Sequence, residues 1–117
     1  MANILSVSYD KALLTTRQQI LEKRGHSVTS PCSLQDALQL CDSDTGFDLF
    51  IVGHSIPRIE KEVLIEHFRA NRPSTPVVAL KRLGETEVRG ANLSIEPTPP
   101  ELLRAVDGLI SGKAASA

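Results

Sequence analysis

Short apolar runs alternate along this chain with longer stretches in which apolar residues recur at helical spacing. The apolar runs predict five strands, at residues 4–8, 26–30, 49–52, 76–80 and 93–95. The run Leu-Phe-Ile-Val at 49–52 contains no polar position, which is typical of a central strand buried on both faces. The pattern therefore indicates a sheet whose middle strand is covered on both sides.

The stretches between these runs predict four helices: residues 10–24, residues 34–41, one that begins after Pro57 and one that Thr98 opens. Ser33 is a good N-cap for the second helix, and Gly25 stands where a C-terminal cap of the first belongs. In the helix after Pro57, the side expected to face the core comprises Ile59, Val63, Leu64 and Phe68.

Strands that alternate with helices through right-handed crossovers build a parallel sheet with helices on both faces. At 117 residues, the compact solution is one α/β domain with a flavodoxin-like, doubly wound, five-stranded parallel sheet of order 2-1-3-4-5. Its functional crevice is expected at the carboxyl ends of the first and third strands, where the strand order reverses. We assign residues 1–110 to this domain and expect a disordered tail of small residues at 111–117.

The connection between the fourth and fifth strands is short. About ten residues separate the strand ends near Lys81 and Glu96, whereas a helix alone averages about 11 residues. The crossover helix there, the fourth helix of a complete flavodoxin-like fold, is therefore expected to be shortened or absent. Its loss would leave apolar surface on the last two strands, so Leu83, Val88 and Leu93 are candidates for a partner or self-association surface. The alternative is that the connection repacks locally over these strands.

The composition is that of an ordinary globular protein. Apolar residues make up 41% and charged residues 23%, and the net charge is -1. A nearly neutral domain has no general attraction for nucleic acid or anionic membranes, and no apolar run approaches the roughly 18 residues of a membrane-spanning helix. We therefore expect a cytoplasmic protein that binds neither, with Cys32 and Cys41 as reduced thiols.

Few residues can face the predicted crevice. They are Ser8, Tyr9 and Asp10 after the first strand, Gly53, His54 and Ser55 after the third, Lys81 and Arg82 at the end of the fourth, and Glu96 and Pro97 at the end of the fifth. A flavin or nucleotide site would need a phosphate-binding loop before the first helix, and Ser-Tyr-Asp-Lys-Ala is not one. No cofactor is therefore expected.

Three segments of the chain resemble the receiver domains of bacterial two-component response regulators. Residues 48–57 are similar to that family's third strand, an apolar run followed by the phosphoacceptor position, two variable residues, an apolar residue and proline. Residues 68–80 resemble its third helix and fourth strand, and residues 96–103 resemble its Lys-Pro motif and last helix. The resemblance extends over residues 3–110 and implies a flavodoxin-like fold and a role in signal transduction.

The chain departs from this family at each position that carries the phosphoryl chemistry. Receiver domains hold Mg²⁺ with two acidic residues and the acceptor aspartate, and they bind the phosphoryl oxygens with a hydroxyl residue and a lysine. Here Ser8 and Tyr9 align with the two acidic residues, and Gly53 aligns with the acceptor aspartate. Lys81 aligns with the hydroxyl residue and Glu96 with the lysine, while Leu93 aligns with the aromatic switch residue. Asp10, a nearby carboxylate, is expected to cap the first helix instead of binding metal. The resemblance thus implies a degenerate pseudo-receiver with no catalysis, no metal and no phosphoacceptor.

These changes point to protein–protein interaction in phosphorylation-independent signalling, with another signalling protein or a second copy of the chain as partner. We also expect Lys81 and Glu96 to form an ion pair across the crevice, unless both are solvated rim residues. Two alternatives stay open: phosphorelay through a non-standard acceptor, His54 or Ser55, and a sensor that binds a small molecule or an anion in the crevice.

Overall fold

The computed structural model describes residues 2–43, 46–81, 84–86, 88 and 90–116. It contains a five-stranded sheet of order β2-β1-β3-β4-β5 in which each neighbouring pair is parallel. The strands are β1 (Asn3–Val7), β2 (Ser27–Thr29), β3 (Leu49–Val52), β4 (Val77–Leu80) and β5 (Leu93–Ile95). The helices in the described residues are α1 (Lys11–Lys23), α2 (Leu34–Asp42), α3 (Arg58–Asn71) and α4 (Pro99–Ser116). The predicted flavodoxin-like topology is confirmed.

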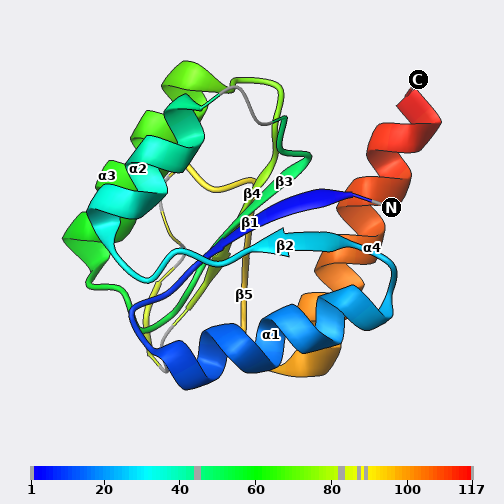
Figure 1. The fold of residues 1–117 in the computed structure, drawn as a ribbon, viewed down its shortest axis with the longest axis horizontal. Coiled ribbons are helices and arrows are strands. Elements are labelled where there is room, and N and C mark those ends of the chain that lie inside the picture. Colours follow the sequence, from blue (N-terminus) through cyan, green and yellow to red (C-terminus); the bar gives the residue numbers. More distant parts are fainter. Residues whose placement is uncertain (1, 44–45, 82–83, 87, 89, 117) are drawn as a thin grey trace.

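The helices form one layer on each face of the sheet (Figure 1). Helices α2 and α3 pack on one face, over a core cluster that includes Val7, Phe50 and Ala79. Helices α1 and α4 cover the other face, where the cluster includes Ile51 and Val78. Every residue of β3 and of β4 is buried, because adjacent residues of a strand point to opposite faces and both faces are covered.

The predicted helix caps are confirmed. The Asp10 carboxylate accepts hydrogen bonds from the amides of Ala12 and Leu13, so it satisfies N–H groups that the first turn of α1 leaves without partners. Ser33 accepts from the amide of Asp36 in the same way. Gly25 follows α1 with φ of 88°, the left-handed conformation in which a glycine ends a helix at least cost.

The connection from β4 to β5 has no helix among its described residues, as expected. It turns at Gly84 and Gly90, whose φ values are 80° and 88°. It then joins the sheet through Asn92, whose amide donates to the Val77 carbonyl while its side-chain oxygen accepts from the Val77 amide. The crossover is therefore held by polar contacts in place of a packed helix.

The predicted core side of α3 was partly wrong. Ile59 is 78% exposed and Val63 45% exposed, whereas Leu64 and Phe68 are buried as expected. The helix is rotated relative to the predicted orientation because Lys61 is fully buried and takes a core position. The apolar pattern alone could not show that a lysine would lie inside.

Helix α4 extends to Ser116. The division into a domain over residues 1–110 and a disordered tail over residues 111–117 stays a prediction. Ala117 lies outside the described residues.

Candidate functional site

The crevice lies at the carboxyl ends of β1 and β3, where the parallel register brings Ser8 and Gly53 side by side. Val7 pairs with Val52, and the Gly53 amide donates to the Val7 carbonyl at 2.8 Å. Both residues were expected in this crevice, and the structure brings them together there.

Gly53 has no room for a side chain. A Cβ at this position would lie 2.8 Å from the Val7 carbonyl oxygen, 2.9 Å from Arg17 Nη1 and 3.0 Å from the Ser8 Cβ. The first of these atoms belongs to the backbone of a paired strand and cannot move aside as a side chain can. Position 53 is therefore closed to any larger residue in this packing.

Arg17, which the sequence analysis missed, fills the space beside Gly53. It lies on the sheet-facing side of α1 between Leu14 and Leu21, and only 6% of it is exposed. Its Nη2 donates to Nδ1 of His54 at 2.9 Å. Since an arginine can only donate, this contact requires a neutral His54 with its proton on Nε2. A spacing of three and four residues from two core leucines was the available signal for a buried Arg17.

The Arg17 guanidinium is poorly compensated. Its Nη1 is buried and has no hydrogen-bond partner, and among the described residues no carboxylate forms an ion pair with it. Burial lowers the pKa of Arg17, and the charge of Asp10 opposes this effect. A guanidinium stays protonated in proteins, so the crevice holds a buried positive charge.

Other crevice residues bond to one another. The Ser8 and Ser55 hydroxyls lie 2.7 Å apart, and Ser8 Oγ also accepts from the Asp10 amide. The Tyr9 hydroxyl donates to Glu60 at 2.7 Å; burial of Tyr9 and then the nearby Glu60 carboxylate raise the pKa of this phenol. Tyr9 is therefore a hydrogen-bond donor that ties β1 to α3.

The predicted ion pair between Lys81 and Glu96 is wrong. Both residues are described, and no ion pair joins them. Their strands are adjacent, since the Lys81 amide donates to the Ile95 carbonyl at 2.8 Å, but Glu96 is exposed. A solvated rim carboxylate gains little from pairing, which favours the alternative of two rim residues.

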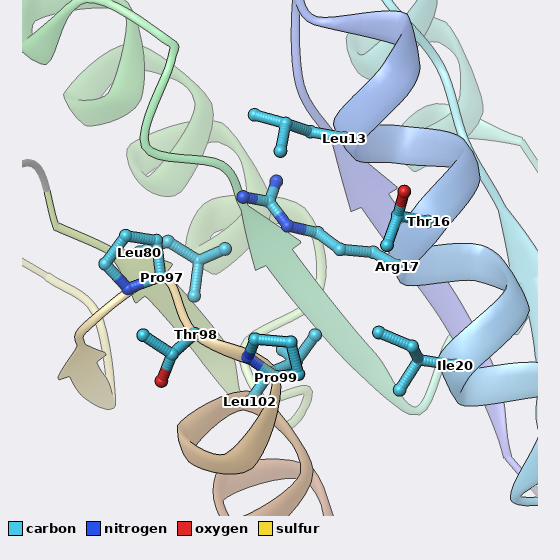
Figure 2. A pocket seen from close by; sticks show the side chains of 9 residues that line it. All are labelled: Leu13, Thr16, Arg17, Ile20, Leu80, Pro97, Thr98, Pro99 and Leu102. Atoms are coloured by element: carbon cyan, nitrogen blue, oxygen red, sulfur yellow. The ribbon is translucent and has the colours of Figure 1, made fainter.

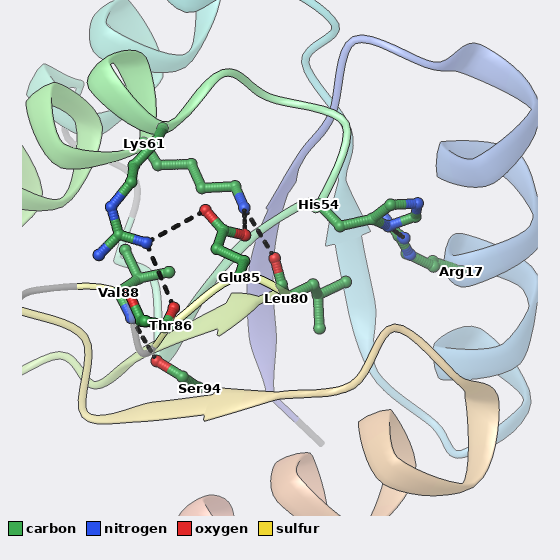
Figure 3. A network of polar contacts seen from close by, with 9 residues as sticks. Arg17, His54, Lys61, Leu80, Glu85, Thr86, Val88 and Ser94 are labelled. Atoms are coloured by element: carbon green, nitrogen blue, oxygen red, sulfur yellow. Dashed lines mark hydrogen bonds and ion pairs between the residues drawn. The ribbon is translucent and has the colours of Figure 1, made fainter. Parts of the chain in front are cut away.

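A different lysine forms the ion pair at this end of the sheet (Figure 3). Lys61 reaches from α3 to the end of β4, where its Nζ donates to the Leu80 carbonyl at 3.0 Å and to Glu85 Oε1 at 2.7 Å. The other carboxylate oxygen of Glu85 faces Arg58 at 3.3 Å. The lysine side chain is 0% exposed and that of Glu85 is 11% exposed. This Lys61–Glu85 latch holds the β4–β5 connection against α3.

The proposed partner surface is only partly available. Val88 is 3% exposed and belongs to the core, so its expected place on an exposed surface is wrong: in the absence of a helix the connection folds Val88 inward, and its amide donates to Ser94 Oγ. Leu83 lies outside the described residues. Leu93 is 39% exposed and lines a groove of about 310 Å³ between β5 and α4.

One cluster of metal-ligating side chains occurs among the described residues. One ligand atom from each of Cys41, Asp42 and His67 lies within 4.8 Å of the others, and His67 Nε2 is 2.8 Å from Asp42 Oδ1. Burial and Asp42 raise the pKa of the Cys41 thiol, which disfavours the thiolate that a metal would need. The contact of His67 with Asp42 is sufficient to explain their proximity. Cys32 and Cys41 are free thiols, the first exposed and the second buried.

No helix within the described residues has the length and apolar character needed to cross a membrane.

The fold is similar to that of solved receiver domains. A response regulator receiver domain protein from Clostridium thermocellum gives a TM-score of 0.87 at 19% sequence identity, with 100% of both chains covered. A CheY-like receiver domain protein from Methanospirillum hungatei gives 0.85 at 22% identity, over 100% of this chain and 99% of the other. The receiver domain of a Francisella response regulator gives 0.82 at 21% identity, over 97% and 99%.

Comparisons with protein-family models and with curated proteins give no match. The structural similarity extends over the whole of this chain in the first two of these comparisons. The chain therefore has the fold of response-regulator receiver domains.

Proposed function

We propose that this chain is a receiver-like domain that acts in signal transduction by binding another protein, without being phosphorylated. One observation carries the proposal: the place where a receiver domain would need its acceptor carboxylate is a glycine enclosed by the Val7 carbonyl and Arg17. Without a carboxylate at position 53, no acyl phosphate forms there.

The residues present do not fit the Mg²⁺ ion that the fold family implies. Mg²⁺ binds through oxygen ligands that include carboxylates, and the three aligned positions are Ser8, Tyr9 and Gly53. The Asp10 carboxylate is engaged with the amides of α1, and the buried guanidinium of Arg17 would repel a divalent cation. The chemistry of this crevice suits a negative ligand better than a metal.

The surface that we propose for a partner is the groove between β5 and α4. It is lined by Leu93, Ile95 and Leu109, with Glu101 and Arg104 among its polar residues. The partner is another signalling protein or a second copy of the chain, since an apolar groove with few charges is suited to a protein and not to nucleic acid or a membrane surface.

An amide NMR titration with Mg²⁺ and beryllofluoride, which mimics an acyl phosphate, tests the loss of phosphorylation. We expect no saturable shifts at Ser8, Gly53, Lys81 and Glu96 up to millimolar concentrations. Saturable shifts at these positions would overturn the proposal. The variant Asp10→Asn is the matched control, because shifts that it abolishes would identify Asp10 as a ligand.

The interaction surface needs its own measurement. Light scattering with size-exclusion chromatography, over a range of protein concentrations, detects a second copy as partner. Leu93→Glu is expected to abolish such association, whereas Ile59→Glu, on the opposite helical layer and 78% exposed, is expected to leave it unchanged. Association that is equally sensitive to both substitutions would contradict the assignment of the groove.

Incubation with acetyl phosphate, followed by intact mass measurement, tests the alternative of phosphorelay through His54 or Ser55. The His54 Nδ1 accepts from Arg17 and the Ser55 hydroxyl is bonded to Ser8, so we expect no mass increase. A gain of one phosphoryl group that His54→Asn or Ser55→Ala removes would favour the alternative.

A further inference from the structure

A cavity of about 70 Å³ lies between α1 and the first turn of α4, over the carboxyl ends of β4 and β5 (Figure 2). Leu13 and Ile20 form its α1 wall, and Leu80, Pro99 and Leu102 form much of the opposite wall. About 10–15 Å³ of such cavity space holds one water molecule, so this volume suits a small organic molecule of about five heavy atoms.

One charged side chain, Arg17, lines this otherwise mainly apolar cavity. Figure 2 shows its guanidinium extending between Leu13 and Leu80, toward the end of β3. Arg17 is only 6% exposed. Its Nη1 has no hydrogen-bond partner, and its Nη2 donates only to the neutral His54 ring. An isolated buried charge costs several kcal/mol unless an opposite charge compensates it.

We propose that this cavity binds the anion of a short-chain monocarboxylic acid, with the carboxylate against Arg17 and the alkyl group between the walls of α1 and α4. A carboxylate matches the planar fork of a guanidinium, and pairing removes the uncompensated charge. The alkyl group would contact Leu13, Ile20 and Leu102, which offer apolar surface and no hydrogen-bond donors.

The lining decides between classes of anion. Phosphate and sulfate present polar oxygens on all sides, and the apolar walls would leave most of these oxygens without partners. The polar groups at the cavity besides Arg17 are the hydroxyls of Thr16 and Thr98, and Thr16 already donates to the Ala12 carbonyl. An ion with one anionic end and one apolar end satisfies both halves of the site.

Binding here would give the domain an input other than phosphorylation. The ligand would join α1 to the start of α4, the helix that also forms one side of the β5–α4 groove. The site itself does not depend on the proposed interaction function, because it rests on the cavity and Arg17 alone.

The test is an amide NMR titration of the full chain with sodium propionate up to about 50 mM, against sodium chloride at the same ionic strength. We expect saturable shifts at Thr16, Leu80 and Thr98 and a rise in Tm. Propionamide, which has the same shape without the charge, is expected to bind at least about tenfold more weakly. Inorganic phosphate is expected to leave these residues unshifted.

Two variants assign the binding to Arg17. Arg17→Leu completes the apolar stripe of Leu14 and Leu21, so we expect it to fold, and to weaken propionate binding at least about tenfold. Arg24→Leu removes an arginine at the C-terminal end of α1 whose side chain is 48% exposed, and this variant is expected to bind propionate as the unmodified chain does. If Arg17→Leu does not fold, Arg17→Lys keeps a charge without the fork and is expected to weaken binding.

The proposal is overturned if propionate gives no saturable shifts, if propionamide binds equally well, or if neither Arg17 variant weakens binding. Stronger shifts with phosphate than with propionate would also overturn it, because the ligand class would then be wrong. The beryllofluoride titration tests the proposed function separately. The carboxylate site can therefore fail its test while the proposed function is upheld, and the reverse also holds.

Discussion

The Lys61–Glu85 latch makes a strong prediction about stability, because its ammonium group is fully enclosed. The Lys61 side chain is 0% exposed, and Glu85 supplies the negative charge at 2.7 Å. The substitution Glu85→Gln keeps the shape and an acceptor oxygen but removes the charge. The ammonium then has only neutral acceptors, among them the Leu80 carbonyl at 3.0 Å.

Removing one partner of a buried pair costs about 3–5 kcal/mol, and we take the lower end because a neutral acceptor remains. The free energy of unfolding of such a domain is about 5–15 kcal/mol, so a loss of about 3 kcal/mol removes a large fraction of its stability. With a denaturant slope of about 1.5 kcal/mol/M in urea, the unfolding midpoint falls by about 2 M.

Lys61→Met is expected to be the milder change of the two. It removes the buried charge and keeps an apolar stem, and Glu85 retains Arg58 at 3.3 Å. The remaining cost is the unpaired Leu80 carbonyl, about 1–2 kcal/mol. The double variant should therefore be more stable than Glu85→Gln alone, since it no longer buries an unpaired ammonium.

Urea unfolding followed by circular dichroism measures all three variants. The control is Asp107→Asn, which breaks the exposed Arg24–Asp107 pair, where the side chains are 48% and 46% exposed; we expect a cost of about 0–1 kcal/mol. A Glu85→Gln cost within about 0.5 kcal/mol of zero, or a double variant less stable than Glu85→Gln, would refute the reasoning.

Three further predictions concern packing, thiols and pH. Gly53→Ala should lower the free energy of unfolding in urea by about 1–3 kcal/mol, because the added Cβ meets the backbone. Gly108→Ala should raise it by about 0.5–1 kcal/mol, because a Cβ there meets nothing within 4 Å and alanine favours the helix. Equal effects of the two substitutions would contradict this reasoning. A thiol reagent should label exposed Cys32 rapidly and Cys41 only on unfolding, because Cys41 is buried and burial raises the pKa of its thiol; rapid double labelling of folded protein would oppose it. Burial and the nearby N-terminus lower the pKa of His26 in the folded state, so the unfolded chain binds more protons, and stability should fall as the pH drops through about 6.5. His26→Gln should reduce that slope, and an unchanged slope would count against the assignment.

The fold could be predicted from the sequence because its signals are repeated along the chain. The fully apolar run of β3, the helix caps at Asp10 and Ser33, and the short crossover each depend on local residue types. The topology then follows from the handedness of parallel crossovers. These features do not require knowledge of any particular side-chain contact.

The site could not be predicted in the same way, because polar residues hold its main contacts from core positions. Arg17 and Lys61 both lie at helix positions where the pattern favours an apolar residue. The spacing of apolar residues therefore does not identify them as buried. Lys61 is buried only because Glu85 reaches it from a segment without periodic pattern. The expected pairing of Lys81 with Glu96 failed for the opposite reason, since adjacent strand ends do not fix solvated side chains.

The packing around Gly53 also restricts the order in which substitutions can accumulate. An aspartate introduced alone would meet both the Val7 carbonyl oxygen at 2.8 Å and Arg17 Nη1 at 2.9 Å. Replacing Arg17 first removes one contact, but relief of the other requires β1 to shift against β3, where the Gly53 amide is bonded to Val7. A carboxylate at position 53 therefore requires several substitutions, and the variants that carry only some of them are expected to be destabilised.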